Sequence, residues 1–177
     1  VINDLALSVK DYSVIIIKST VPIGTNNHIK NFLENKHPNL KFDIVSNPEF
    51  LREGAALNDF MYPDRLIIGS DSDKAKGVMA KIYEPIIDDG VSVLYTDLES
   101  AEMIKYASNA FLAIKVSFIN EIANLCEKVD ANIDLVSMGM GMDSRIGNKF
   151  LQTGPGFGGS CFPKDTSALI MKGKDVG

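Results

Sequence analysis

The stretch from Asp97 to about Val129, which contains no glycine or proline, does most to restrict the fold. Apolar residues recur in it at the spacing of about 3.6 residues that places them on one face of an α-helix. Examples are Ile104, Phe111, Ile114, Phe118, Ile122 and Leu125. Asp97 or Ser100 can cap its beginning, because an oxygen there accepts hydrogen bonds from the free N–H groups of the first turn. The stretch therefore predicts one long helix.

Short apolar runs alternate with polar, helix-like segments before this stretch. The pattern predicts strands over 13–19, 42–46, 65–69 and 91–96, and helices over about 26–35 and 72–85. The first run, Ser13 to Ser19, is rich in β-branched residues, as is typical of a strand buried on both faces of a parallel sheet. The alternation predicts an α/β fold built from βα units, with a boundary to a mainly helical part near Asp97.

A long loop follows the helix that the sequence predicts over about 134–140. It runs from Met142 to Lys164, and we expect Asp165 to cap a final helix. Loops of this length inside compact domains are usually functional or disordered. The loop ends in GPGFGGSCFPKDT, in which four glycines allow positive φ and close approach of a ligand to the backbone.

Cys161 follows these glycines. A thiol near a helix N-terminus and near Lys164 has its thiolate form favoured, which makes it a better nucleophile. A buried free cysteine beside a tight turn fits the same residues equally well. Cys126 lies in the middle of the long helix, and we expect it to be a buried structural thiol.

Lys105 and Asn109 lie one turn apart on the long helix, so they share one face of it. That face also carries Leu112 and Val116, which indicates partial burial. A buried lysine is costly unless it is paired or used. The pair can donate hydrogen bonds to a substrate hydroxyl or a developing oxyanion. A lysine that extends to solvent beside an exposed asparagine is the alternative.

Two carboxylates follow the predicted strand 42–46, in the segment SNPEFLREG. In open α/β sheets, ligands bind beyond the carboxyl ends of the strands. Glu49 and Glu53 are expected at that edge, together with the hydroxyl of Thr20 from the neighbouring strand. One carboxylate could act as a general base toward water. Alternatively, both could cap a following helical turn.

Charge and cysteine content exclude several classes of protein. The 177 residues carry a net charge of −5 and scattered basic residues, which argues against binding to nucleic acid or to an anionic membrane surface. The apolar run Val14 to Ile17 is far too short to span a bilayer. Two cysteines without a CxxC pair indicate reduced thiols in a cytoplasmic protein and no metal site. Because Val1 is not Met, we expect the chain to be an internal portion of a longer protein.

Four segments together resemble the UDP-glucose/GDP-mannose dehydrogenase family: KSTVPIGT, NPEFLREGAALNDFMYPDRLIIG, the K-x-x-x-N helix, and SRIG followed by GPGFGGSCFPKDT. The resemblance covers about Val14 to Leu169. PEFLREG followed by PDRLIIG is most similar to members that oxidise UDP-glucose. The resemblance to the family implies that 1–97 is the C-terminal portion of a Rossmann-like NAD-binding domain. It further implies that 98–177 is a helical central domain that carries the catalytic cysteine loop and forms a homodimer through the long helix.

The resemblance also implies a chemistry: NAD-dependent oxidation of the C6 alcohol of UDP-glucose to the carboxylate of UDP-glucuronate, with two NAD⁺ consumed. Cys161 would be the nucleophile that forms a thiohemiacetal and then a thioester. Lys105 and Asn109 would stabilise the oxyanion. Asp165 and Thr20 would order a catalytic water. Glu53 would activate this water against the thioester.

Ligand contacts are implied at further positions. Those to the sugar nucleotide would come from Glu49, Phe50, Leu51, Arg52, Glu53, Lys105, Asn109, Arg145, Phe150, Leu151, Gln152, Thr153, Gly154 and Gly158. Those near the nicotinamide half of NAD would come from Thr20, Glu53 and Lys164.

The sequence departs from the family pattern in three places. The family's GxGxxG fingerprint after its first strand, which binds the cofactor pyrophosphate, is absent, and so is its third domain. Phe150 stands where many relatives have tyrosine. We therefore expect these 177 residues alone to be inactive.

Three other functions fit parts of the pattern. One is oxidation of GDP-mannose or UDP-N-acetylmannosamine by the same chemistry. A second is two-electron oxidation of a β-hydroxyacid, which also uses a lysine and an asparagine one helical turn apart but needs no cysteine. The third is a non-catalytic dimerisation module, because the long helix is apolar over a wide face.

Overall fold

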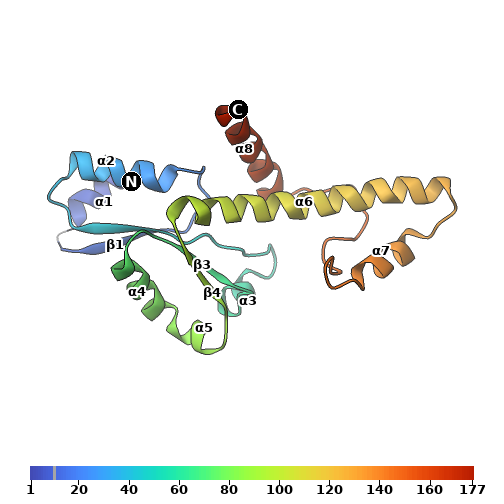
Figure 1. Ribbon diagram of the computed structural model, residues 1–177, viewed down its shortest axis with the longest axis horizontal. Coiled ribbons are helices and arrows are strands. Elements are labelled where there is room, and N and C mark those ends of the chain that lie inside the picture. The colour runs from blue at the N-terminus through green and yellow to red at the C-terminus, as the bar shows by residue number, and fades with distance from the viewer. Residues whose placement is uncertain (10) are drawn as a thin grey trace. The chain divides into compact units, whose positions relative to one another are not determined.

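The computed structural model describes residues 1–9 and 11–177. Figure 1 shows its elements in chain order: α1 (Ile2–Ser8), β1 (Ser13–Ile17), α2 (Thr25–Lys36), β2 (Phe42–Ser46), α3 (Ala56–Met61), β3 (Leu66–Gly69), α4 (Asp73–Ile82), α5 (Glu84–Asp88), β4 (Val93–Thr96), α6 (Leu98–Lys128), α7 (Ile133–Gly141) and α8 (Cys161–Val176). The chain forms two compact units, residues 1–105 and 106–177, and their boundary falls within α6.

The first unit is built around a four-stranded sheet in the order β1-β2-β3-β4. β1 and β2 are parallel from Ser13↔Phe42 to Ile17↔Ser46, and β3 and β4 are also parallel. β2 and β3 are antiparallel and pair only at Ser46↔Gly69. The α/β, Rossmann-like prediction is confirmed, but the sheet is mixed. The connection from β2 to β3 contains only the short α3, which has no buried residue, so no helix packs across the sheet as a parallel crossover requires.

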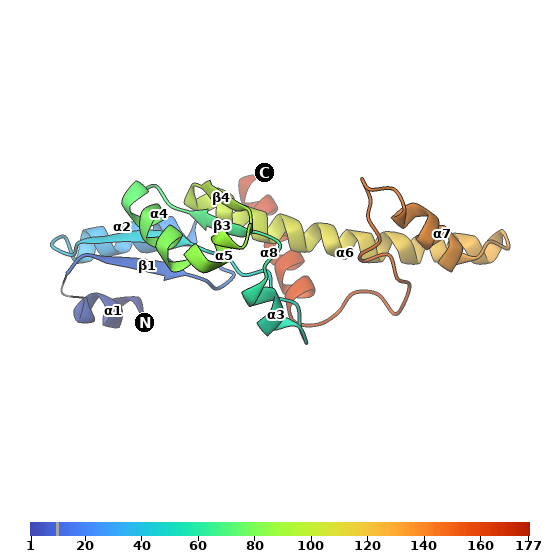
Figure 2. The same ribbon diagram turned by 90° about the horizontal axis from the view of Figure 1, so that it is seen from below.

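The sheet is covered by helices on both faces. Successive residues of a strand point to opposite faces, and Ile44 and Val45 of β2 show this. Val45 packs on the α4 side, with Leu66, Ile68, Ala75, Met79 and Tyr83. Ile44 packs on the other side, with Ala6, Ile15, Leu33 and Leu98. Figure 1 shows α2 on one side of the strands and α4 and α5 on the other, and Figure 2 shows α1 alongside β1.

The predicted elements recur with small shifts. Strand 42–46 coincides with β2, and helix 26–35 corresponds to α2. The predicted helix 72–85 is divided at Tyr83 into α4 and α5, and Pro85 lies in the first turn of α5, where its missing N–H leaves no helical hydrogen bond unmade. The helices α1 and α3 were not predicted.

In the second part of the chain, the prediction of one long helix is confirmed by the 31 residues of α6. Asp97 caps it, accepting hydrogen bonds from the backbone N and the Oγ of Ser100 at 2.7 and 2.8 Å. The prediction that Asp165 caps the last helix is wrong, because α8 begins at Cys161. Pro163 does not delay this start, because a helix makes no internal hydrogen bond with the N–H groups of its first turn.

Candidate active site

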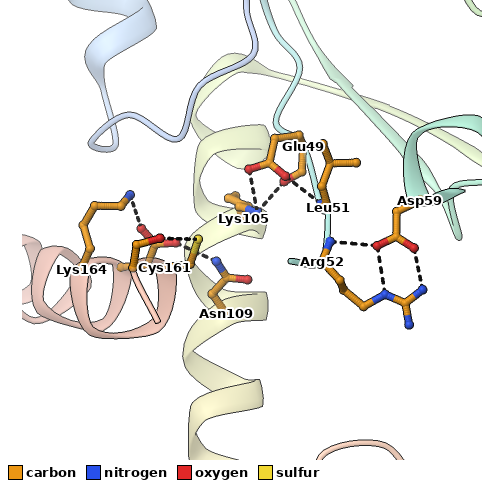
Figure 3. A network of polar contacts seen from close by, with 10 residues as sticks. Glu49, Leu51, Arg52, Asp59, Lys105, Asn109, Cys161 and Lys164 are labelled. Carbon is orange, nitrogen blue, oxygen red and sulfur yellow. Dashed lines mark hydrogen bonds and ion pairs between the residues drawn. The ribbon is translucent and has the colours of Figure 1, made fainter. Parts of the chain in front are cut away.

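Lys105 is the buried centre of the polar residues in the first unit. Only 5% of it is exposed, so the predicted burial of this face of α6 is observed. Its Nζ donates a hydrogen bond to the backbone carbonyl of Glu49 and lies 3.5 Å from Glu49 Oε1, as Figure 3 shows. The ring of Phe50 lies 5.0 Å from the same nitrogen. The lysine therefore does not extend to solvent, and it holds the segment that follows β2.

Asn47 fixes the start of that segment. Its backbone N donates to Ile17 at 2.9 Å and its Nδ2 donates to the carbonyl of Ile67 at 2.8 Å. Its Oδ1 accepts hydrogen bonds from Lys18 Nζ and Tyr83 OH, at 2.9 and 2.6 Å. One buried amide thus joins the ends of β1 and β2 to β3 and to the end of α4.

Arg52 is held by Asp59, a residue that the sequence analysis did not identify. Three hydrogen bonds join them, from the backbone N, Nε and Nη2 of Arg52 to the carboxylate, at 2.8, 2.9 and 2.5 Å (Figure 3). Hydrogen bonding to Asp59 raises the pKa of Arg52. Glu49 Oε2 accepts a hydrogen bond from the N of Leu51 at 2.7 Å, and Glu53 is exposed. The structure therefore brings Glu49 to Lys105 and leaves Glu53 facing solvent.

A second polar group lies in the unit of residues 106–177. Asp165 is 1% exposed, and its two oxygens accept hydrogen bonds from Asn109 Nδ2 and Lys164 Nζ, each at 2.6 Å. Its hydrogen bond raises the pKa of Lys164. Asp165 is thus a buried acceptor and not the predicted cap. Cys161 is the exposed first residue of α8 and lies one helical turn before Asp165, so the two share a face of the helix.

Side chains of α6 and α7 hold the chain that leads to Cys161. Ser137 Oγ donates to the carbonyl of the buried Leu151 at 2.5 Å, and Asn120 Oδ1 accepts a hydrogen bond from the N of Gly154 at 3.1 Å. Phe150, which precedes Leu151, has a left-handed backbone with φ of 65°, and its ring lies 6.1 Å from that of Phe162. The sequence analysis missed Ser137 and Asn120. Both are polar residues at half-buried positions of helices, and the burial is evident only in the structure.

The remaining predicted residues of this unit are mostly exposed. Arg145 forms an ion pair with Asp143, with Nη2 2.5 Å from Oδ2, and this hydrogen bonding raises the pKa of Arg145 and lowers that of Asp143. Exposed positions in the loop include Gln152, Thr153, Gly154 and Gly158. Cys126 is buried in α6, as the sequence analysis expects.

Sequence models of one family match both parts of the chain. Residues 1–87 match the "UDP-glucose/GDP-mannose dehydrogenase family, NAD binding domain", and residues 99–177 match the central domain of the same family. The chain belongs to the UDP-glucose/GDP-mannose dehydrogenase family. The resemblance inferred from the motifs is therefore confirmed, and so is NAD as the cofactor that the first domain of the family binds.

Individual members of the UDP-glucose/GDP-mannose dehydrogenase family are similar over nearly the whole chain. UDP-glucose 6-dehydrogenase of Rhizobium meliloti is 49% identical over 98% of this chain and 40% of its own length. A UDP-glucose dehydrogenase structure from Pyrobaculum islandicum, 40% identical, has a TM-score of 0.87 over 93% of this chain and 38% of its own. UDP-D-ManNAc dehydrogenase from Pyrococcus horikoshii, 29% identical, has a TM-score of 0.83 over 98% and 41%. The chain spans about two fifths of these relatives.

Part of the family's NAD site fits the first unit. The parallel strands β1 and β2 end together at Ile17 and Ser46, and their carboxyl ends lead into the segments that carry Thr20 and Glu53. Dinucleotides bind in the crevice outside such strand ends. Thr20 is half-buried there. The glycine-rich turn after a first strand, which binds the pyrophosphate in the family, is not part of this sequence.

Two further observations concern metals and membranes. Within residues 1–9 and 11–177, no group of three or more His, Cys, Asp or Glu side chains is arranged to hold a metal ion. Over the same residues, no helix has both the length and the hydrophobicity needed to cross a bilayer.

Proposed function

We propose that the full-length protein is an NAD-dependent UDP-glucose 6-dehydrogenase, which oxidises the C6 alcohol of UDP-glucose to the carboxylate of UDP-glucuronate. The proposal is supported by relatives with that name that are about half identical to nearly the whole chain, such as those of Rhizobium meliloti. In the proposal, residues 1–97 contribute to the NAD-binding domain. Residues 98–177 contribute the helical domain with the reactive cysteine.

One observation carries the proposal. Cys161 is exposed at the first position of α8, and one turn later the buried Asp165 binds Asn109 and Lys164. In the proposal, Cys161 is the nucleophile, and a fixed carboxylate and an amide donor on neighbouring positions support acyl chemistry through a covalent intermediate. A purely structural thiol would not need an exposed position beside a buried polar group.

The thiol makes the second oxidation possible. Bound NAD⁺ would supply the hydride acceptor for both oxidations at C6, with one molecule consumed in each. Cys161 adds to the aldehyde that the first oxidation leaves, forming a C–S bond, and the carbonyl oxygen takes up a proton. The resulting thiohemiacetal has a C–H bond on a carbon that also carries oxygen. Its oxidation gives a thioester, which water then cleaves to the carboxylate and the free thiol.

Lys105 and Asn109 stabilise charge on the C6 oxygen in this proposal. Both are donors, both are buried, and they lie one turn apart on α6. Donors that are already oriented act most strongly in a site from which water is excluded, and the loss of one such donor typically costs about 10²- to 10³-fold in rate. The contacts of Lys105 with Glu49, and of Asn109 with Asp165, hold the two donors in place.

Hydrolysis of the thioester requires an ordered water. We assign its ordering to Asp165 and Thr20 and its activation to Glu53, which is exposed and therefore open to solvent. The positions of Thr20 and Glu53, each beyond the carboxyl end of a strand, support this assignment. With Lys164, these two residues also lie near the nicotinamide in the proposal.

The glycine-rich segment supports a sugar-nucleotide site. Gly156 and Gly159 have positive φ, of 105° and 74°, so the fold itself requires glycine there. At Gly154 and Gly158 the backbone does not require it, and an added Cβ would meet no heavy atom within 4 Å. A ligand that lies against the backbone would explain these two glycines. The sugar nucleotide would contact Glu49, Phe50, Leu51, Arg52, Glu53, Arg145, Phe150, Leu151, Gln152, Thr153, Gly154 and Gly158.

A second candidate substrate is UDP-N-acetylmannosamine or GDP-mannose, with the same chemistry. The structural similarity to UDP-D-ManNAc dehydrogenase favours it, but at 29% identity against 40% for the UDP-glucose dehydrogenase structure. The rate of NADH formation by the full-length protein with each sugar nucleotide distinguishes these substrates.

We also propose a homodimer formed through α6. Several large apolar side chains of this helix are about half exposed or more, at the three- and four-residue steps that align them along one stripe. They are Phe111 (62%), Ile114 (61%), Phe118 (48%) and Leu125 (55%). Contiguous exposed apolar surface marks interaction sites, and a second copy of the same helix would cover it.

The decisive experiment is to trap the covalent intermediate. The full-length protein is mixed with UDP-glucose and NAD⁺, quenched with acid during turnover, digested and analysed by mass spectrometry. We expect the peptide that contains Cys161 to carry the mass of the oxidised sugar nucleotide. Asp165→Asn should increase the amount of adduct, because it slows hydrolysis.

Two variants make the experiment specific. Cys161→Ser should remove both the adduct and acid formation, while Cys126→Ala, at the buried thiol of α6, should leave both in place. Acid formation that survives in Cys161→Ser would contradict the proposal. Oxidation of a β-hydroxyacid that is unchanged in Cys161→Ser would favour a two-electron dehydrogenase. Binding of a second copy without any stabilisation by UDP-glucose in thermal unfolding would favour a non-catalytic dimerisation module.

A further inference from the structure

Glu102 is a buried carboxylate that the proposed reaction does not use. It lies on α6, three residues before Lys105, and is 3% exposed. Its Oε2 accepts a hydrogen bond from the backbone N of Gly24 at 2.5 Å. Its Oε1 accepts two more, from the N and the Nδ2 of Asn26, at 2.9 and 2.5 Å. All these residues belong to the first unit. A buried charge is costly unless it is paired in this way, so the arrangement is specific.

The three hydrogen bonds replace a cap that α2 lacks. The N-cap residue of α2 is Gly24, which has φ of 95° and no side chain, and the first turn carries no acidic residue. An α-helix usually begins at a residue whose side-chain oxygen accepts hydrogen bonds from the free N–H groups of the first turn. Glu102 provides that oxygen from α6, and its negative charge is favourable at the positive end of the α2 dipole.

Glu102 therefore fixes one end of the segment that carries Thr20. The other end is fixed by β1, where Ile17 pairs with Ser46 and Lys18 Nζ donates hydrogen bonds to Asn47 Oδ1 and Tyr83 OH at 2.9 and 3.0 Å. Only the short segment from Ser19 to Ile23 remains between the two anchors. Pro22 restricts its backbone further.

The same helix also holds the segment after β2. Glu102 binds Gly24 and Asn26, and Lys105, one turn along α6, binds Glu49. Two side chains of opposite charge thus attach the chain after β1 and the chain after β2 to one face of α6. The proposed catalytic hydroxyl and the proposed sugar-binding carboxylate are therefore placed by a common support.

We propose that Glu102 is a positioning residue, whose carboxylate holds the Thr20 segment in the place that the water-ordering step needs. The inference rests on the proposed function for the role of Thr20. It assigns to Glu102 an effect on catalysis without any contact to substrate. The charge is essential to it, because the carboxylate offers acceptors to all three donors, whereas an amide would turn its own N–H₂ group toward one of them.

The test is Glu102→Gln in the full-length protein. We expect kcat for UDP-glucuronate formation to fall about 10- to 100-fold, the range typical of lost positioning. KM for UDP-glucose should change less than twofold, because its proposed contacts lie in residues 49–53, 105–109 and 145–158. Slower hydrolysis should also raise the steady-state fraction of Cys161 that carries the thioester, read by mass spectrometry. Amide hydrogen exchange should become faster in residues 19–27.

Three further variants separate positioning from general damage. Glu99→Gln is the matched control, since the exposed Glu99 lies one turn earlier on α6 and accepts a hydrogen bond from the side chain of Asn27. It should retain wild-type kcat. Glu102→Asp keeps the charge and should recover part of the lost rate. Asn26→Ala removes one of the three hydrogen bonds, and we expect a loss of only a few fold, so the proposal can be tested even if Glu102→Gln does not fold.

Two results would overturn the inference. One is a folded Glu102→Gln protein with kcat within twofold of that of Glu99→Gln and unchanged hydrogen exchange in residues 19–27. The other is a fall in kcat matched by an equal rise in KM for UDP-glucose. If the wild-type protein oxidises no sugar nucleotide, the proposed function fails, and the exchange comparison still decides whether Glu102 holds the segment.

Discussion

The two ends of α6 differ in the kinds of side chain that they bury and expose. Near the start, charged and polar side chains are buried: Glu102, Lys105 and Asn109 are 3%, 5% and 7% exposed. Further along, large apolar side chains are about half exposed or more. Propensity for helix does not distinguish the two stretches, since both are free of glycine and proline.

The difference bears on whether stability alone explains the burial of each side chain. Burial of polar groups stabilises a protein only if they are fully paired, and an apolar residue would often serve stability as well. Each buried group at the start of α6 has a specific partner: the α2 N-terminus, Glu49 or Asp165. The proposed reaction gives a reason for these buried polar groups, and the proposed dimer gives a reason for the exposed apolar stripe.

The largest effect that we expect is from Lys105→Met, which has a similar volume without the charge. The rate of UDP-glucuronate formation should fall about 10³-fold, because the buried donor that we propose for the C6 oxygen is lost. Thermal unfolding should change little, since the desolvation cost of the cation disappears together with its contacts. Steady-state kinetics and calorimetry on the full-length protein measure both.

The control for Lys105→Met is Lys128→Met, at the exposed last residue of the same helix. It should leave the rate unchanged. If Lys105→Met kept more than a tenth of the wild-type rate, the role of Lys105 would be structural. The contrast with the apolar stripe would then say nothing about catalysis.

The next effect is on assembly. Phe111→Glu and Phe118→Glu lie two turns apart on the stripe, and each should raise the dissociation constant of the dimer about 10²-fold, because a carboxylate would be buried against an apolar partner. Sedimentation velocity measures the change. Because both side chains are about half exposed or more, the isolated protomer should unfold at an unchanged temperature. If both variants dimerised with the dissociation constant of the wild-type protein, the interface would lie elsewhere.

Much of this fold can be predicted from the sequence, because local signals decide it. The period of apolar residues and the Asp97 cap define α6, and the run of β-branched residues defines β1. The direction of β3 cannot be predicted in this way. It depends on whether the connection after β2 packs a helix across the sheet, and α3 buries no residue there.

The site shows the same division. Lys105, Asn109 and Cys161 can be identified from spacing and motif, but Glu102 cannot, because its partners Gly24 and Asn26 lie far away in the sequence. A glutamate on the buried face of a helix is the only signal. The start of α8 was predicted wrongly for a different, local reason. The helix begins at Cys161, before Pro163, because a proline is tolerated within the first turn.

A smaller effect is expected from Asn109→Asp. The new carboxylate would face Asp165 at a contact that now measures 2.6 Å, with both groups buried. Repulsion should lower the free energy of unfolding at pH 7 by about 2 kcal/mol. Near pH 4 the loss should shrink, because one carboxylate then holds a proton. Chemical denaturation at the two pH values measures this, and Asn120→Asp, which keeps its acceptor for Gly154, should show no such dependence.

The smallest effect concerns the Asp97 cap of α6. Hydrogen bonds from the backbone N–H and then the hydroxyl of Ser100 lower the pKa of Asp97 in the folded protein. The stabilisation is therefore present above the unfolded pKa and is lost as the pH falls through the lower folded value. Asp97→Ala should cost about 0.5 to 1 kcal/mol at pH 7, a modest amount because solvent screens this exposed side chain. Asp97→Asn keeps an acceptor but does not titrate, so its difference from wild type should shrink as the pH falls below about 4, the unfolded pKa of aspartate. If that difference were constant from pH 7 to pH 3, the cap would act through geometry alone, and charge would matter on α6 only where it is buried.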